Sequence, residues 1–421
     1  MTGSAGGASA GPLPVAPRGG PLGHRPFRWL LAARTTSVLG NAVAPIALAF
    51  AVLDLTGSAA DLGLVVAARS VANVAVLLLG GVVADRLPRD AVLVGTSLAA
   101  ALTQAVVAAL VVTGSATVPS LVVLSVLNGA VAAVSLPASA ALVPETVPAE
   151  LLRPANALLR LGLNGGSVVG ASAGAGVVAV VGPGWGLAVD AAGFALAGVL
   201  FAGMRLPRAG ERSRPGGRPA SVLADLREGW SEFTKRSWVW IVVAQFAVLN
   251  AAFVGATTVL GPVVADGSFG RAAWGLVVAA QTVGLAVGAL VALRWRPRHG
   301  LAVGVGLMAV TAVPVAALGV APVLPALVVA FLLGGVALEV FAITWDQSLQ
   351  TRVPREALAR VYSYDMVGSF VAIPVGEVLV GPAAHLFGTR ATLLVCAGVV
   401  LAATAAALST RSVRQLTLDG A

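Results

Sequence analysis

Four carboxylates lie inside long apolar stretches of the sequence. Glu339 and Glu377 lie near the middle of their stretches, whereas Asp190 and Asp365 lie closer to an end. An ionisable side chain costs free energy to bury in such a stretch, which makes it a functional candidate. Because burial favours the protonated form of a carboxyl group, these residues could bind a proton or a cationic substrate. A structural salt bridge with an arginine is the alternative for Glu339 and Glu377.

Amide and indole side chains in the same stretches are candidates for lining a substrate cleft. An isolated polar residue in an apolar helix commonly joins two helices, so we expect only about half of the set to line a cleft. The set comprises Asn41, Asn73, Gln104, Asn128, Asn164, Gln245, Asn250, Gln281, Trp345 and Gln347.

The sequence contains no pattern typical of an enzyme. Its one lysine, Lys235, is not part of a Gly-x-x-x-x-Gly-Lys phosphate-binding loop, so any active transport must draw on an ion or solute gradient. His24, His299 and His385 lie far apart, and the single cysteine, Cys396, lies in an apolar run. We therefore expect no metal site, no disulfide and no cofactor.

The composition is that of a membrane protein. Of the 421 residues, 58% are apolar and 11% are charged, against roughly 45–50% and about 25% in soluble proteins. These proportions exclude a soluble enzyme, a disordered chain and a nucleic-acid-binding protein. The net charge is +9, but all basic residues except Lys235 are arginines, in short clusters between apolar runs. Such clusters orient a membrane protein in the bilayer.

Twelve apolar runs are long enough to cross a bilayer as helices, and none alternates as the strands of a membrane barrel do. We therefore predict an all-α membrane protein with twelve transmembrane helices. The predicted spans are Phe27–Leu53, Ala60–Ala84, Ala91–Thr113, Val118–Val143, Pro154–Val181, Trp185–Met204, Trp238–Ala265, Ala272–Leu293, Leu301–Val320, Val323–Trp345, Val361–Leu386 and Ala391–Leu408.

The placement of arginines predicts the orientation of these spans. Both terminal segments and the even-numbered connections hold most of the basic residues, and Arg271 and Arg390 are the exceptions in the odd-numbered connections. Because positive charge stays on the cytoplasmic side, both termini are predicted to be cytoplasmic. We expect a multi-pass protein of the cell membrane.

The sixth connection divides the chain into two similar halves. We predict a disordered tail (1–26), a six-helix bundle (27–204), a linker with an amphipathic helix (205–237), a second six-helix bundle (238–409) and a short tail (410–421). The segment Gly63–Ala68 recurs as Gly275–Ala280 at the start of the second and eighth spans. Parallel repeats of six spans are typical of transporters with two bundles around a central cleft.

The second connection carries a recognisable cluster. It reads Gly80-Gly-Val-Val-Ala-Asp85-Arg86-Leu-Pro-Arg89, and Gly81, Asp85, Arg86 and Arg89 fit the Gly-x-x-x-Asp-Arg/Lys-x-Gly-Arg/Lys pattern. In this the sequence resembles the major facilitator superfamily, which implies the fold of two six-helix bundles. In that family the cluster latches the bundles together on the cytoplasmic side. A solvated turn is the alternative interpretation.

Further motifs resemble the efflux branch that includes enterobactin exporters and macrolide-efflux-type permeases. They include Thr56-Gly-Ser58, Leu142-Val-Pro-Glu145 and Gln350-x-x-Val-Pro354. The fifth span resembles the antiporter motif of spaced glycines, with Ala171 at its proline position. These glycines either allow the helix to bend or serve only close packing. Two features depart from relatives: Asn41 stands where many have Asp, and the fourth span has no arginine.

The resemblance implies a secondary transporter, and we predict a proton-coupled exporter of small amphipathic molecules that works by alternating access. If a proton is used, Glu339 or Glu377 is the expected carrier, followed by Asp190 or Asp365. Facilitated efflux or uptake without a proton, and a non-transporting receptor, remain alternatives. We expect a monomer in the lipid bilayer, with a small-molecule substrate and no nucleic-acid partner.

Overall fold

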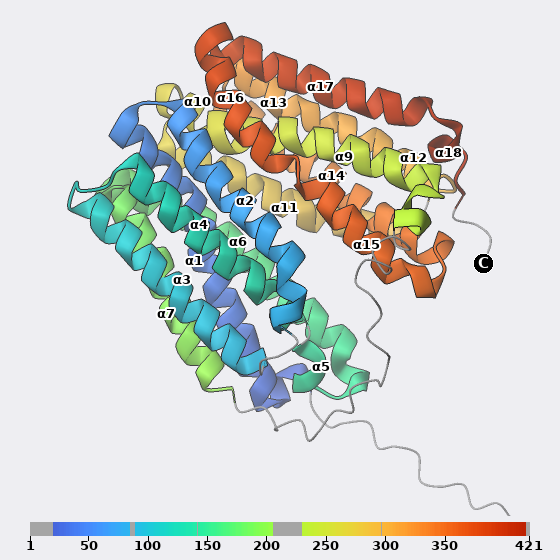
Figure 1. The fold of residues 1–421 in the computed structure, drawn as a ribbon, viewed down its shortest axis with the longest axis horizontal. Helices are drawn as coiled ribbons and strands as arrows, with labels where there is room; N and C mark the ends of the chain where they lie inside the picture. Colours follow the sequence, from blue (N-terminus) through green and yellow to red (C-terminus); the bar gives the residue numbers. More distant parts are fainter. Residues whose placement is uncertain (1–19, 85–88, 141, 205–229, 296, 418–421) are drawn as a thin grey trace, which may run out of the picture.

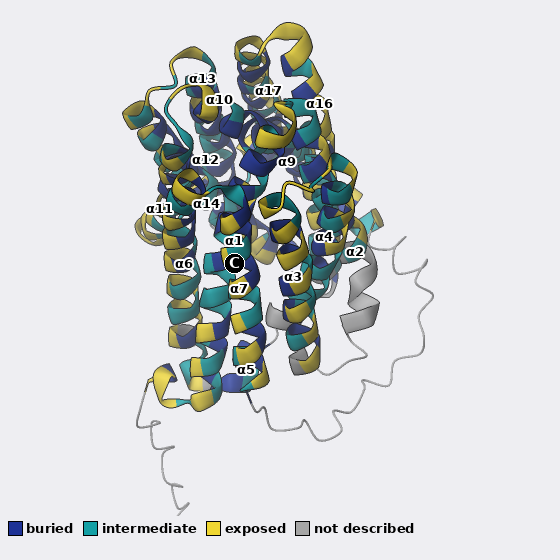
Figure 2. Cartoon of the chain, turned by 90° about the vertical axis from the view of Figure 1, so that its left-hand side faces the viewer, coloured by how far each residue is buried: buried dark blue, intermediate teal, exposed yellow. Residues whose placement is uncertain are grey.

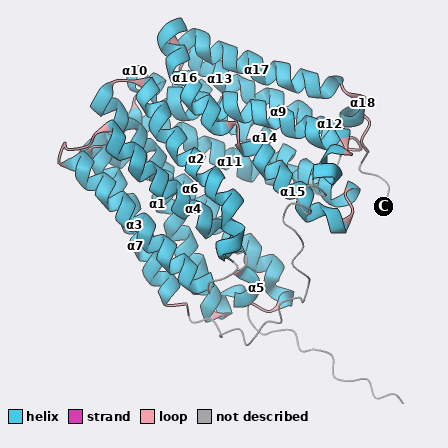
Figure 3. Ribbon diagram, viewed as in Figure 1, coloured by secondary structure: helices cyan, strands magenta, loops and turns pink. Residues whose placement is uncertain are grey.

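The computed structural model describes residues 20–84, 89–140, 142–204, 230–295 and 297–417. Within these ranges the chain is helical and forms no strand (Figure 3). Twelve helices of the described chain are long and apolar enough to cross a membrane. The predicted all-α membrane fold with twelve spans is therefore confirmed.

The first half contains six long helices and one short one. Gly57 ends the first of them in the left-handed conformation (φ 64°), which a residue without Cβ adopts at low cost, and its N–H donates to the carbonyl of Leu53. The helices are α1 (Arg25–Thr56), α2 (Ala59–Ala84), α3 (Arg89–Val112), α4 (Val118–Ala140), α5 (Val143–Thr146), α6 (Leu152–Val181) and α7 (Pro183–Ala202).

The second half also crosses six times, but three of its spans are interrupted. They are α9 (Ser237–Gly255) with a π-helical turn (Ala256–Leu260) and α10 (Gly261–Gly267); α11 (Arg271–Arg294); α12 (Gly300–Leu307) with a 3-10 turn (Met308–Thr311) and α13 (Ala312–Val320); α14 (Leu324–Arg352); α15 (Arg355–Phe370) and α16 (Ile373–Phe387); and α17 (Thr389–Ser409), followed by the short α18 (Arg411–Arg414).

Each interruption has a proline shortly after it. Pro262 follows the π-helical turn, Pro314 follows the 3-10 turn, and Pro374 follows the break between α15 and α16. Proline removes a backbone donor and clashes with the preceding turn, so the α-helical hydrogen bonds are rearranged there. Each of these three spans was predicted as a single apolar run, and the positions of the breaks were not predicted.

The two halves meet at one end of the molecule. Helix α2 packs against α16, and α6 packs against α11. Figure 1 shows the two groups of helices converging near α10 and diverging toward α5 and α15. We call the α2–α16 and α6–α11 contacts the seam, and the opposite end, which carries Met204 and Trp230, the linker end.

The repeated segments occupy equivalent places in the seam. A Cβ added to Gly63 of α2 would collide with the backbone carbonyl of Glu377 in α16. A Cβ added to Gly275 of α11 would collide with Ala171 and Ala175 of α6. Each glycine thus lets a helix of one half approach a helix of the other half closely. The internal repeat predicted this equivalence.

The glycines of the fifth span serve close packing in this conformation. Helix α6 is continuous, and a Cβ on Gly166 would lie 3.0 Å from the carbonyl oxygen of Thr35 in α1. Gly170 meets Leu39 and Gly174 meets Val43 on the same helix in the same way. The spacing of four residues places these glycines on one face of α6.

Large apolar side chains cover the outside of the molecule. Val180 is 84% exposed, and Leu293, Leu386 and Phe387 are also largely exposed. Figure 2 shows such positions in yellow on outward helix faces, with buried positions in dark blue between the helices. An apolar outer surface of this extent fits a lipid environment.

The predicted amphipathic helix of the linker lies mostly outside the described residues. Its last part, residues 230–234, is helical. There Phe233 is buried, and the rings of Trp230 and Phe233 contact Tyr364 of α15 at centroid distances of 5.6 and 5.8 Å. This part of the segment packs against the second half.

Candidate functional site

An arginine lies deep within the first half. Arg69 is ten residues into α2, which corresponds to about 15 Å from the start of the helix. Its Nη2 donates a hydrogen bond to Oδ1 of Asn41 on α1 at 3.1 Å. Asn41 therefore holds the guanidinium in place instead of supplying a carboxylate.

A buried carboxylate, Asp190 of α7, lies in the same half as Arg69 and interacts with it electrostatically. Its side chain is fully buried, and its Oδ2 accepts a hydrogen bond from Nε2 of Gln104 on α3 at 2.5 Å. Within the described part of the chain its Oδ1 has no hydrogen-bond partner. Helix α1 comes close at Gly40, where an added Cβ would lie 3.2 Å from that oxygen.

A second buried carboxylate, Glu377 of α16, belongs to the other half and packs against α2, the helix that carries Arg69. Glu377 is 2% exposed and lies in the seam, where its backbone carbonyl meets Gly63 of α2. Its Oε2 has no partner among the described residues. Asp190 and Glu377 both interact electrostatically with Arg69. We call Arg69, Asp190 and Glu377 the central cluster.

The central cluster contains one fixed positive charge and two carboxylates. With both carboxylates ionised it carries one net negative charge, and with one of them protonated it is neutral. Charge is costly in a low-dielectric interior, so the neutral form is favoured. A protonated carboxyl would also give an unpartnered oxygen a hydrogen to donate. The cluster is therefore chemically suited to hold one exchangeable proton.

A polar cavity of about 330 Å³ lies next to Arg69 inside the first half. Arg34 and Asn41 of α1 line it, together with Asn73 of α2 and Asn128 of α4. No described carboxylate lies within 4 Å of either arginine in this cavity. Asp190 and Glu377 offset the charge of Arg69, so the positive character of the cavity comes from Arg34.

The other predicted carboxylates lie apart from the central cluster. Glu339 of α14 is half-buried, and it interacts electrostatically with Arg160 of α6 and with Asp346 of its own helix. Asp365 of α15 accepts hydrogen bonds from Trp345 and Ser369 near the linker end. Of the four predicted carboxylates, Asp190 and Glu377 are the two that interact electrostatically with Arg69.

The predicted cleft residues divide into three groups. Gln104, Asn41 and Trp345 hold charged side chains in place. Four others join helices: Asn73 donates to the carbonyl of Gly129, Asn128 to Thr103, Gln245 to Thr404 and Asn250 to the carbonyl of Ser369. Asn164 and Gln347 are exposed, and Gln281 is half-buried on α11.

The predicted latch lies largely outside the described residues. Asp85 and Arg86 fall in the gap between α2 and α3. Gly81 belongs to α2 and Arg89 begins α3, but their surroundings are not described. The latch therefore stays a prediction.

An ion pair joins the two halves beyond the seam. Nη1 and Nη2 of Arg271, at the start of α11, donate to the carboxylate of Asp54 on α1 at 2.9 and 2.6 Å. Nε of Arg271 donates to Asp266 at 2.6 Å, and its guanidinium lies 4.8 Å from the ring centroid of Phe50. Paired N–H donors match a carboxylate well, so this contact fixes α1 against α11.

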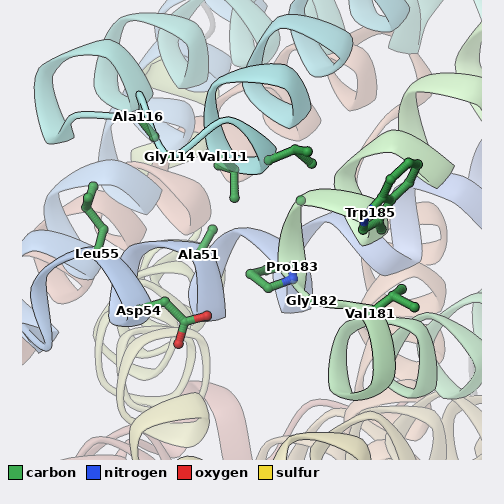
Figure 4. A pocket seen from close by; sticks show the side chains of 12 residues that line it. Ala51, Asp54, Leu55, Val111, Gly114, Ala116, Val181, Gly182, Pro183 and Trp185 are labelled. Atoms are coloured by element: carbon green, nitrogen blue, oxygen red, sulfur yellow. The ribbon is translucent and has the colours of Figure 1, made fainter.

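Asp54 borders a cavity of about 370 Å³. Figure 4 shows Asp54 and Ala51 on α1, facing the start of α7 at Pro183 and Trp185. The cavity leaves room for a longer side chain at position 54.

Comparison with known proteins agrees with this architecture. The sequence profile of a family described as transmembrane secretion effectors matches residues 18–419. The chain belongs to this family. It is 27% identical over 383 residues to the multidrug efflux pump Tap of Mycolicibacterium fortuitum. The aligned residues cover 88% of this chain and 91% of Tap.

Solved structures with the same fold are major facilitator transporters. The nucleoside transporter NupG superimposes with a TM-score of 0.75 at 16% identity, over 91% of this chain and 98% of NupG. A second structure is a bacterial homologue of the human lysosomal transporter Spinster in an inward-facing and unoccupied conformation. It superimposes with a TM-score of 0.73 at 15% identity, over 92% of this chain and 96% of the homologue. The predicted major facilitator fold is confirmed. This transmembrane secretion effector is a membrane transporter and not an enzyme.

Sequence reasoning missed two features of this family member. Arg69 was not among the predicted site residues, although it lies far from both ends of α2. The Asp54–Arg271 pair was missed because the two residues are 217 positions apart. The sequence did offer one indication, because Arg271 is a basic residue in an odd-numbered connection, where few basic residues occur.

Proposed function

We propose that the protein is a proton-coupled exporter of small amphipathic molecules that works by alternating access. The central cluster carries this proposal, because its excess carboxylate lies where the two halves meet. A proton bound there can respond to movement of the halves. The similarity to the multidrug efflux pump Tap supports export of amphipathic molecules.

The arginine clusters favour a cytoplasmic location for the linker end and both termini. In this orientation the seam and the Asp54–Arg271 pair face the outside of the cell membrane. The similarity to an inward-facing Spinster homologue agrees with an arrangement open to the cytoplasm. The predicted latch at Gly81, Asp85, Arg86 and Arg89 would then close the cytoplasmic side in the opposite conformation.

The seam links proton binding to conformation. Closing the seam buries Glu377, and burying a neutral carboxyl costs far less than burying a charged one. Protonation from outside would therefore favour closure of the seam and the return to the cytoplasm-facing state. Proton entry would thus accompany the return step after a substrate is released outside.

Facilitated transport without a proton is the second candidate function. It is favoured by Asn41, which stands where many relatives have Asp, and by the lack of an arginine in the fourth span. In that case Arg69 and its two carboxylates would have a structural role only.

Flux measurements with the wild-type protein separate the two candidates. In inverted vesicles with an acidic lumen, we expect ethidium, an amphipathic aromatic dye, to accumulate up to about tenfold per unit of pH gradient if one proton exchanges for one dye. Ethidium fluorescence would report the flux, and vesicles without the protein are the control. Protein-dependent flux that does not change when an ionophore collapses the gradient would favour facilitated transport. No protein-dependent flux would contradict the proposed substrate class.

The latch is tested by Asp85→Asn. If Asp85 stabilises the state closed to the cytoplasm, we expect ethidium flux to fall by roughly tenfold or more, since a charged hydrogen bond contributes about 1.5–3 kcal/mol. Protein abundance in the membrane should stay near normal. Arg86→Lys should have a smaller effect because lysine keeps the charge without the bidentate geometry. An unchanged flux in Asp85→Asn would reject the latch.

A further inference from the structure

A cavity of about 170 Å³ lies between α9, α14 and α15 in the second half. Its walls combine aromatic rings with carboxylates. They include Phe246 of α9, Phe341, Trp345 and Asp346 of α14, and Asp365 of α15. We call this the aromatic–carboxylate cavity.

The rings form a continuous wall. Phe246 and Phe341 stack with centroids 5.2 Å apart and an interplanar angle of 28°. Phe341 in turn stacks with Trp345 at 6.4 Å and 12°. The face of an aromatic ring carries negative electrostatic potential and attracts cations, most strongly at tryptophan.

The carboxylates are held by neutral donors. Oδ2 of Asp365 accepts a hydrogen bond from Nε1 of Trp345 at 3.0 Å, and Oδ1 accepts one from Ser369 at 3.1 Å. Oδ1 of Asp346 accepts one from the hydroxyl of Tyr362 at 3.1 Å. No lysine, arginine or histidine in the described part of the chain lies within 4 Å of either carboxylate. Their negative charge has no cationic partner there.

We propose that the aromatic–carboxylate cavity binds the cationic aromatic group of the transported molecule, with Asp365 as its counter-ion. The inference rests on the proposed function and adds the charge and chemical class of the substrate. Ring faces and a fixed carboxylate together favour an organic ammonium over a neutral or anionic group. The positive charge of Arg34 in the polar cavity of the first half would disfavour binding of the same group there.

The position of the cavity suits capture from the cytoplasm. Trp345 lies seven residues before the end of α14, about 10 Å from the linker end. Asp346 and Met366 at its edge are exposed. In the proposed orientation an amphipathic cation could enter from the cytoplasm or the inner leaflet. Glu377 lies twelve residues beyond Asp365, so cation and proton would use different carboxylates.

Calorimetric titration of the purified full-length protein in lipid nanodiscs tests this site. The probes are benzyltrimethylammonium and phenylmethanesulfonate, which share an aryl–methylene body with a tetrahedral head and carry opposite charges. At pH 7.5 and equal ionic strength, we expect the ammonium to bind and the sulfonate not to bind. Asp365→Asn should weaken ammonium binding by about tenfold or more, and Phe341→Leu should weaken it by a few-fold.

A matched control separates the site from a general loss of negative charge. Asp61→Asn removes a half-buried carboxylate in the first turn of α2, outside the cavity, and should leave ammonium affinity unchanged. Thermal unfolding of each variant verifies that the fold is intact, and if Asp365→Asn does not fold, Phe341→Leu provides the test.

Three outcomes would overturn the inference: equal ammonium affinity in wild type and Asp365→Asn, tighter binding of the sulfonate, or an equal loss in Asp61→Asn. Binding is measured without a pH gradient. Loss of ammonium binding therefore tests the site, whereas loss of gradient-driven flux tests the proposed function.

Discussion

Replacing Glu377 by glutamine is expected to abolish proton-driven accumulation of ethidium in inverted vesicles. Glutamine keeps the shape of the side chain but cannot exchange a proton, so the central cluster would stay neutral throughout the cycle. With a pH gradient of two units, the accumulation ratio should fall from up to about a hundredfold to the level of vesicles without the protein. Exchange of ethidium for ethidium across the same vesicles should persist, because it needs no net proton movement.

Glu339→Gln is the matched control for this experiment. Glu339 is also a carboxylate in a membrane-spanning helix of the second half, but it is half-buried and lies outside the central cluster. We expect its replacement to keep most of the gradient-driven accumulation. If Glu339→Gln loses accumulation and Glu377→Gln keeps it, Glu339 is the carrier. If both variants respond to the gradient as the wild type does, the test moves to Asp190→Asn.

Reversing the charge of Asp54 is expected to open the seam end of the transporter. In Asp54→Arg, two guanidinium groups would replace the Asp54–Arg271 pair. Losing an attractive pair of about 1 kcal/mol and adding a repulsion of similar size would shift the conformational equilibrium by roughly thirtyfold. Spin labels at Thr56→Cys and Ser268→Cys, with Cys396→Ser, would report this as a population with a longer distance between the labels.

The double variant Asp54→Arg/Arg271→Asp provides the control. It restores one positive and one negative charge in exchanged positions, so the short distance between the labels should return at least in part. Asp266 would then face a carboxylate at position 271, and the recovery should be incomplete for that reason. A distance distribution that is the same in all three proteins would show that the pair does not hold this end closed.

The sequence predicted the spans well because a membrane imposes one simple requirement on every helix. Each crossing needs a long apolar run, and arginines accumulate at one side. The breaks before Pro262, Pro314 and Pro374 were not predicted, since proline inside a membrane helix has several outcomes that depend on neighbouring helices.

The central cluster was only partly predictable. Asp190 and Glu377 stood out as carboxylates within apolar runs, but nothing local shows that residues 187 positions apart approach the same arginine. Depth in the membrane was the one available indicator, because Arg69, Asp190 and Glu377 each lie well inside a helix. Residues at similar depth on helices that face a common centre are candidates for contact.

The use of glycine at the seam has a consequence for the speed of conformational change. At Gly63 and Gly275 the two halves touch through backbone and small atoms, without long side chains inserted between them. Side chains that interlock must change rotamer to separate and lose conformational entropy when they pack again. A contact between helix backbones requires neither a rotamer change nor a loss of side-chain entropy, so the halves can separate as rigid bodies. The kinetic barrier to separation then resides mainly in a few polar interactions, such as the pair between Asp54 and Arg271.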